Sequence, residues 1–512
     1  MSTTSENNKR IARNTAFLYI RMLLIMFVTL YTSRVVLQAL GITDYGIYSV
    51  VGGIVAMFSF INSAMTSATQ RYITFELGRG NALRLKEVFS TSINIHATIS
   101  LMIIILAETI GLWFLKTKMT IPIERVNASL WVYHFSVLSC IIMVMSVPYN
   151  ATIVAHEKMK AFAFISILEV ILKLVIVYIL LISIFDVDRL KLYAVLMFSV
   201  QLISRLVYGY YCKKNFEETK YKWYWNKTLL KEMTYFAGWS LFGNLAAISF
   251  TQGINLLLNI FFGPIVNAAR GVAVQVQMAV QSFCMNFQMA LNPQITKTYA
   301  TNDLYQMHKL IFASSKYSFF LLFLLSFPIM IETEYILSIW LEEIPDHTVT
   351  FVRLILCVSM IDALSNPLGI SSQATGHIRN YQIIIGGILL LIVPISYILL
   401  RLGGLPECVF IVHLIIALLA QFVRILLVRS MIKLSIKQYF VKVIYKIVVV
   451  VLFSSIIPLI IYQEVSSGWT RLLLICAVSF FSVLIVVYWI GFEKNEKVFV
   501  RDKIRFLLKR KI

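Results

Sequence analysis

Charged side chains in the middle of long apolar segments are the residues of this sequence that point most directly to chemistry. Glu169 and Lys173 lie four residues apart in the apolar stretch 161–185. At that spacing an acid and a base share one face of a helix and can pair. Charges inside a membrane-spanning helix usually face protein or water. The pair is either a buried structural ion pair or a charged substrate site. We favour the second, because paired charges in a membrane are costly to keep for stability alone.

Asp362 is a third ionisable residue of this kind, in the apolar stretch 348–373. It stands four residues before Asn366 and Pro367. A proline inside a helix leaves backbone carbonyl groups without their hydrogen-bond partners. A simple helix kink is the favoured interpretation of this region, and a coupling site for H+ or Na+ that uses Asp362 is the alternative.

Two arginines, Arg21 and Arg34, interrupt the first apolar stretch, 14–40. Their spacing places them on different faces of a straight helix. An arginine near the bilayer centre costs about 2.5–3.5 kcal/mol on insertion scales. Two interpretations are open: the arginines line a polar cavity, or their long side chains reach the two opposite headgroup layers.

The stretch 234–261 is unusually polar for a membrane span. Its amides, mostly at helical spacing, are Asn244, Gln252, Asn255 and Asn259. Amides hold membrane helices together through hydrogen bonds, and they also bind sugars. The sequence leaves both roles open, and we take Gln252 and Asn255 as candidates for substrate binding.

Composition identifies the chain as an all-α polytopic membrane protein. Of its 512 residues, 59% are hydrophobic and only 14% are charged, whereas about a quarter of the residues of soluble domains are charged. A membrane-spanning helix needs about 20 apolar residues. We read about fourteen such runs, at approximately 14–40, 45–69, 88–115, 126–155, 161–185, 190–211, 234–261, 265–291, 309–331, 348–373, 379–401, 406–428, 441–462 and 469–491.

Basic residues gather on alternate connections between these runs. They lie in the leader and near 71–86, 158–160, 213–231, 297–309, 377–379, 429–442 and 494–511. The positive-inside rule then places both termini in the cytoplasm. The basic residues behind the net charge of +21 therefore set the orientation of the chain in the membrane and do not indicate a nucleic-acid partner. The six cysteines form no CxxC pair, so we expect neither disulfides nor a metal site.

The lay-out of the chain is repeated once. Gly41 begins GITDYGIYS and Gly263 begins GPIVNAARG in the second half of the chain. Further along, Pro148 and Pro367 match at nearly the same separation as these two glycines. Because each copy has six spans, both copies enter the membrane from the same side, which is the parallel type of repeat.

The repeat predicts four parts of the chain. These are an N-terminal six-helix lobe at 1–211, a cytoplasmic linker at 212–233, a C-terminal six-helix lobe at 234–430, and two further spans with a basic cytoplasmic tail at 431–512.

Two stretches carry a resemblance to a known family. RVVLQALGITDYGIYSVVGGIV follows an arginine-bearing span, and MALNPQITKTYATND ends the eighth span. The first resembles the polysaccharide transporter family, the O-antigen type oligosaccharide-lipid flippase branch of the multidrug/oligosaccharidyl-lipid/polysaccharide exporter superfamily. The second is similar to that superfamily. The resemblance implies a V-shaped, two-lobed protein of the bacterial inner membrane, with a central cavity open alternately to each side. It also implies cavity arginines, which match Arg21, Arg34 and Arg270.

The leading functional hypothesis is a transporter that flips polyprenyl-pyrophosphate-linked oligosaccharide to the outer leaflet for polysaccharide or O-antigen export. A pyrophosphate crossing hydrocarbon unaided would face a cost of tens of kcal/mol, so its path needs water and cations. We expect no cofactor. The expected partners are the lipid-linked substrate, membrane lipids, H+ or Na+, and glycan-assembly enzymes.

Two alternatives lead to different chemistry. An ion-coupled multidrug exporter of the same architecture would carry acidic sites for cationic drugs, and Asp362 and Glu169 keep this possibility open.

A membrane-embedded polysaccharide polymerase or glycosyltransferase generally places catalytic residues on sizeable outer loops. The loops here are short and carry no HExxH or G-K-[ST] signature, so the sequence predicts a protein that is not an enzyme.

Overall fold

The computed structural model describes residues 4–56, 59–118, 121–182, 188–341, 344–493, 496–498 and 501. These residues are helical almost throughout, and they contain no strand. Within this described part, twelve helices are long and apolar enough to cross a membrane. The predicted all-α polytopic class is therefore confirmed.

Two of the fourteen predicted spans are not among those twelve helices. The predicted span 45–69 includes positions 57 and 58, which lie outside the described residues, and the residues on either side are helical. The predicted span 265–291 is continuous helix, but its arginine and its many amides make it more polar than its neighbours. Length and helicity were thus predicted correctly there, and the apolar character was overestimated.

The chain divides into two compact units. Unit 1 comprises Met1–Leu245, Thr296–Asp303 and Gly376–Arg379, and unit 2 comprises Ala246–Ile295, Leu304–Thr375 and Asn380–Ile512. The long helix α8 (Lys227–Ala300) contributes to both units. The limits predicted for the lobes, the linker and the appended spans stay predictions.

Unit 1 is built around α5, which contacts five neighbouring helices. Its elements are α1 (Thr4–Ala56), α2 (Ser59–Arg79), α3 (Ala82–Leu106), η1 (Ala107–Gly111), α4 (Leu112–Lys118), η2 (Ile123–Arg125), α5 (Val126–Ala155), α6 (Met159–Ile182), α7 (Arg189–Asn215) and η3 (Glu217–Thr219). Helices α1, α2, α3, α6 and α7 all pack on α5. Buried aromatic rings such as Tyr133 and Phe89 fill the spaces among these helices.

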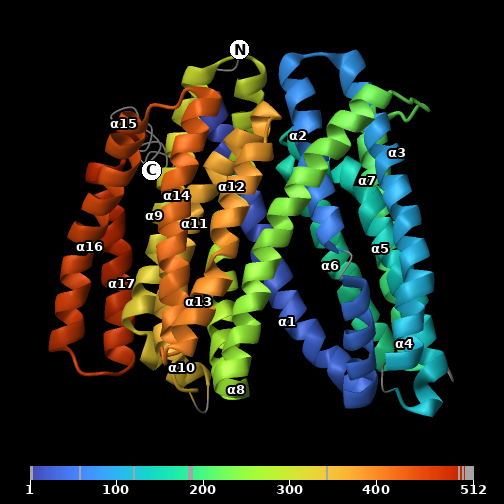
Figure 1. Cartoon of the computed structure of the whole chain (residues 1–512), viewed down its shortest axis with the longest axis horizontal. Coiled ribbons are helices and arrows are strands. Elements are labelled where there is room, and N and C mark those ends of the chain that lie inside the picture. Colours follow the sequence, from blue (N-terminus) through green and yellow to red (C-terminus); the bar gives the residue numbers. More distant parts are fainter. Residues whose placement is uncertain are drawn as a thin grey trace, which may run out of the picture. The chain divides into compact units, whose positions relative to one another are not determined.

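Unit 2 has its core around α11, which packs on α9 and α14. Its elements are α9 (Leu304–Ile331), α10 (Thr333–Trp340), α11 (Thr348–Thr375), α12 (Arg379–Leu390), α13 (Ile392–Arg401), α14 (Glu407–Ile432), α15 (Ile436–Tyr439), η4 (Phe440–Ile444), α16 (Tyr445–Glu464), α17 (Trp469–Val486) and η5 (Val487–Gly491). Figure 1 shows α16 and α17 side by side, and both contact α9.

The two longest helices are each broken at a glycine. Gly41 in α1 has φ 80° and ψ 167°, and Gly263 in α8 has φ 78° and ψ −169°. This region of backbone space is essentially restricted to glycine. The two glycines are the pair that begins the predicted repeat, so the repeated sequence has the same unusual backbone in both copies.

Other backbone features recur at the spacing of the repeat. Gly80 and Asn302, which are as far apart in the sequence as Gly41 and Gly263, both have positive φ, at 70° and 57°. A second pair, Glu157 and Gly376, has φ 57° and 82°. This pair has the same spacing as the two matching prolines, which lie inside α5 and α11. These matches support the sequence repeat, because helix breaks and left-handed residues are set by local sequence.

Candidate functional site

The charged pair predicted in the fifth span is present in unit 1. On α6, the Nζ of Lys173 lies 2.7 Å from the Oε1 of Glu169. Gln201 on α7 also reaches Glu169, with its Nε2 at 3.5 Å from the same oxygen. The Lys173 and Glu169 side chains are 34% and 26% exposed, so neither charge is fully buried. Their role in substrate binding stays a prediction.

Arg21 on α1 faces the same helix. Its guanidinium carbon lies 4.6 Å from the centre of the Phe162 ring, a cation–π contact between α1 and α6. The guanidinium also interacts electrostatically with Tyr208 and Glu169. Among the described residues Arg21 forms no ion pair, and its buried Nε has no hydrogen-bond partner. The positive charge of Arg21 is therefore only partly balanced.

Arg270 is the corresponding cation of unit 2. Its Nη2 donates to the carbonyl oxygen of Thr251 at 3.0 Å, and its Nη1 donates to the Oδ1 of Asn255 at 3.3 Å. In a straight helix Arg270 would lie about 22 Å from Asn255, so the contact requires the break at Gly263. His413 on α14 interacts electrostatically with Arg270. Within the described residues Arg270 has no carboxylate partner.

The amides of unit 2 divide into two groups. Gln277 and Gln281 donate to the Oγ of Ser359 at 3.0 and 3.2 Å, which ties α8 to α11. Gln252 is exposed on α8, and Asn255 is partly exposed beside Arg270. The first group holds helices together, and the role of the second group in substrate binding stays a prediction.

Asp362 is exposed on α11, one turn before the helical Pro367. Arg424 of α14 interacts with it electrostatically. Arg424 is buried and donates to the hydroxyl of Ser365 and to the Oε1 of Gln421, the latter at 3.2 Å. Arg424 was not among the candidates from sequence, because its burial depends on the packing of α14 against α11.

The structure groups the predicted residues within each unit. Unit 1 brings Arg21 to Glu169 and Lys173, and unit 2 brings Arg270 to Asn255. Among the described residues, neither Gln252 nor Asp362 forms a hydrogen bond or an ion pair with these groups. The backbone of Arg34 belongs to α1, and its side chain lies outside the described residues.

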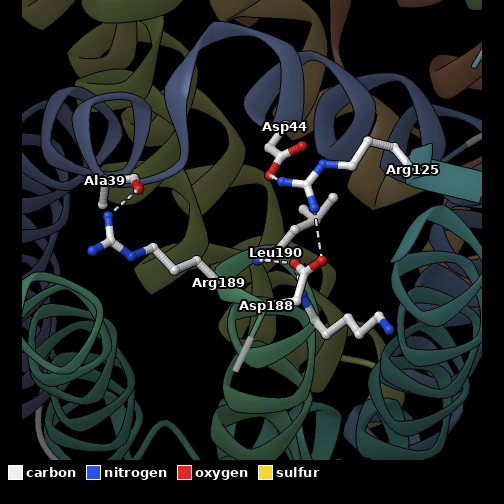
Figure 2. Close-up of polar contacts among 7 residues, drawn as sticks. Ala39, Asp44, Arg125, Asp188, Arg189 and Leu190 are labelled. Atoms are coloured by element: carbon white, nitrogen blue, oxygen red, sulfur yellow. Dashed lines mark hydrogen bonds and ion pairs between the residues drawn. The ribbon is translucent and has the colours of Figure 1, made fainter. Parts of the chain in front are cut away.

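A second polar cluster of unit 1 lies at the turn that follows the break in α1 (Figure 2). Arg125 bridges two carboxylates: it is hydrogen-bonded to Asp44, and its Nη1 lies 2.7 Å from the Oδ2 of Asp188. Asp188 also caps α7 by accepting from the backbone N–H of Leu190 at 3.0 Å. Burial raises the pKa of Asp44, although Arg125 opposes the shift. This cluster joins α1 to the starts of α5 and α7, and each of its three charges has a partner of opposite sign.

Comparison with solved structures gives the fold. The chain matches a crystal structure of a MATE mutant with a TM-score of 0.73, 14% identity, and coverage of 83% of this chain and 96% of the other. It matches an outward-facing multidrug resistance MATE family transporter of the MOP superfamily with a TM-score of 0.71 and 15% identity, over 83% and 96% of the two chains. The chain has the fold of MOP superfamily transporters.

A third match is a MOP superfamily transporter from Pyrococcus furiosus, described as having a binding pocket of reverse polarity that suggests a different function. It has a TM-score of 0.68 and 15% identity, over 83% of this chain and 96% of the other. No family model matches the chain, and no curated protein matches it. At such low identity the likeness extends to the fold alone, and one fold can serve several functions. The predicted superfamily fold is therefore confirmed, and the O-antigen flippase branch is not shown.

Proposed function

We propose that this protein is a membrane transporter that carries an anionic amphiphile, and that the amphiphile is a polyprenyl-pyrophosphate-linked oligosaccharide. One observation carries the proposal: the membrane-embedded cations Arg21 and Arg270 have no carboxylate partner among the described residues, whereas Glu169 is paired with Lys173 at 2.7 Å. The net charge of these sites is positive. Positive sites favour a phosphate over a cationic drug.

The physical requirement of such a cargo fits these residues. A pyrophosphate loses most of its hydration when it leaves water, and only fixed cations and hydrogen-bond donors offset that loss. Arg270 lies beside Asn255 and has only neutral hydrogen-bond acceptors among the described residues, and Arg21 keeps its Nε unpaired there. The exposed amide of Gln252 is suited to a sugar hydroxyl. In this proposal the arginines bind the pyrophosphate and the amides bind the glycan.

The resemblance supplies the direction and the setting of the proposal. The protein moves its cargo from the cytoplasmic to the outer leaflet of the bacterial inner membrane by alternating access, with both termini in the cytoplasm. The proposed coupling ion is H+ or Na+, which would bind at Asp362. The proposed partners are glycan-assembly enzymes.

Flipping of lipid-linked oligosaccharide in proteoliposomes tests the proposal. We expect Arg270→Gln to lower the flipping rate about tenfold, since a charge-assisted contact to phosphate contributes about 1.4 kcal/mol or more. Arg270→Lys should keep much of the rate. The matched control is Arg401→Gln, because Arg401 is exposed on α13 and bonds only to Tyr397 within the described part of the chain. Equal rates in Arg270→Gln and Arg401→Gln would remove Arg270 from the substrate site.

A multidrug exporter is the second candidate, and the fold comparison favours it, because one matching structure is described as a multidrug resistance transporter. The exposed carboxylate of Asp362 is the residue that such an exporter would use. Efflux of a cationic dye that is lost in Asp362→Asn and kept in Arg270→Gln would support this candidate and contradict the flippase.

A further inference from the structure

The connection of α5 to α6 carries a carboxylate that is almost completely buried. The Glu157 side chain is 1% exposed and lies between two cations. The Nε of Arg10 lies 2.9 Å from its Oε2, and the Nζ of Lys297 lies 2.9 Å from its Oε1. Arg10 belongs to the start of the chain and Lys297 to the end of α8, and all three residues belong to unit 1. Segments distant in sequence thus meet at one carboxylate.

The backbone holds Glu157 firmly in this position. Its φ of 57° lies in the left-handed region, and its carbonyl oxygen accepts a hydrogen bond from the Nδ2 of Asn14 at 3.0 Å. The preceding His156 contacts Glu218 at 2.5 Å and stacks on Phe216 with ring centres 4.2 Å apart. The connection is therefore fixed on both sides of the carboxylate.

A close helix contact lies beside this ion-pair cluster. A Cβ added at Gly78, near the end of α2, would stand 3.0 Å from the Cβ of Ala300 and 3.0 Å from the Cα of Lys297. Only glycine fits so close to another backbone. Gly78 and Ala300 also have the same spacing in the sequence as Gly41 and Gly263, which makes them equivalent positions of the repeat.

The second connection of the repeat makes the matching contact. Gly376 is the equivalent of Glu157, and a Cβ at Gly376 would stand 2.7 Å from the Nη2 of Arg71 on α2. Arg71 is itself held over the Tyr72 and Phe75 rings at 4.5 and 4.6 Å. The α5–α6 connection of the first copy thus contacts the end of α8 in the second copy. The α11–α12 connection of the second copy contacts α2 in the first copy. The two connections differ at the equivalent position, where the first has the carboxylate of Glu157 and the second has Gly376.

We propose that Glu157, with Lys297 and Arg10, is a latch that holds the two copies of the repeat together at this end of unit 1. The connections that meet here are among those that the charge pattern assigns to the cytoplasm. The latch rests on the proposed function in one respect: a transporter that works by alternating access must separate these helix ends once in each cycle. Removal of the Glu157 charge leaves two neighbouring cations that repel each other, so the ends should separate more easily.

Cysteine accessibility measures that separation without any substrate. The six natural cysteines are first replaced, and a single cysteine is introduced as Ala300→Cys at a position that is 8% exposed. In purified protein we expect Glu157→Gln to raise the rate of maleimide labelling at this cysteine about fivefold or more. The matched control is Glu217→Gln, whose side chain is 84% exposed and whose ion pair with Lys86 has a distance of 3.7 Å.

A second cysteine, in unit 2, distinguishes local opening of the latch from destabilisation of the whole protein. Cys284 is buried in unit 2, and a variant that keeps only this natural cysteine should label at the same rate with and without Glu157→Gln. A rise at both reporters, or a rise at neither, would overturn the latch. If Glu157→Gln does not fold, Lys297→Gln is used, because it leaves the Glu157–Arg10 pair intact. An unchanged rate at position 300 in that variant also contradicts the proposal. Since the assay needs no cargo, its failure is distinct from failure of the proposed substrate.

Discussion

At the scale of single residues, the charges of this protein differ in how far they are balanced. Glu157 and Asp188 accept from more than one partner, and Arg125 bridges two carboxylates. Glu169 and Lys173 balance each other, but both stay partly exposed. Such a pair can stabilise the fold, bind the substrate, or do both. Exchange of the two residues separates these roles, because it preserves the pair and moves the positive charge.

The exchange Glu169→Lys with Lys173→Glu should restore stability but not transport. Removal of one partner of a fully buried pair costs about 3–5 kcal/mol, and the partial exposure here reduces that cost. The double variant keeps the pair, so its thermal stability should exceed that of Lys173→Met. The positive charge moves by one helical turn, about 5.4–6 Å, and a carboxylate takes its place. Flipping in proteoliposomes and thermal unfolding are the two measurements. Normal transport by the exchanged variant would show that Lys173 does not contact the phosphate.

At the scale of elements, the break in α8 positions the cation of unit 2. Arg270 reaches Asn255 and Thr251 only because α8 changes direction at Gly263. The backbone at Gly263 lies where a side chain is strongly disfavoured. One glycine therefore determines the geometry of the unit 2 site.

Gly263→Ala should lower both stability and transport. A residue with a side chain at this φ and ψ costs about 1–3 kcal/mol, and relief of the strain would move Arg270 away from Asn255. The control is Gly387→Ala in α12, where an added Cβ meets no atom within 4 Å and φ is not positive. That substitution should leave unfolding unchanged or raise stability slightly. A stable Gly263→Ala protein with normal flipping would argue against the importance of the break.

At the scale of the whole molecule, the fold is that of MOP superfamily transporters, and the orientation in the membrane is the next property to measure. The predicted topology places the linker inside the cell and the acidic loop near Asp346 outside. Lys220 and Asp346 are both exposed and offer equivalent reporter positions.

Single cysteines in a cysteine-free background should distinguish the two sides. In intact cells an impermeant thiol reagent should label Asp346→Cys and not Lys220→Cys, and both should react after the membrane is opened. Labelling of Lys220→Cys from outside would reverse the topology. It would also place the proposed latch on the outer side of the membrane.

The sequence by itself determined those features that depend on short-range patterns. Apolar run lengths predicted the all-α membrane class, and the four-residue spacing predicted the Glu169–Lys173 pair, because both follow from the geometry of one helix. The match of Gly41 with Gly263 predicted a repeat that the backbone supports, since positive φ depends on local residue type.

The tertiary structure alone decided which polar groups are already satisfied. It showed that Gln277 and Gln281 bind Ser359 whereas Gln252 is exposed, and that Arg424 is buried against Ser365. It also brought Lys297 to Glu157, 140 residues away. Burial and ion pairing depend on which helix faces meet, and a hydropathy pattern along one chain cannot define the partner of a face.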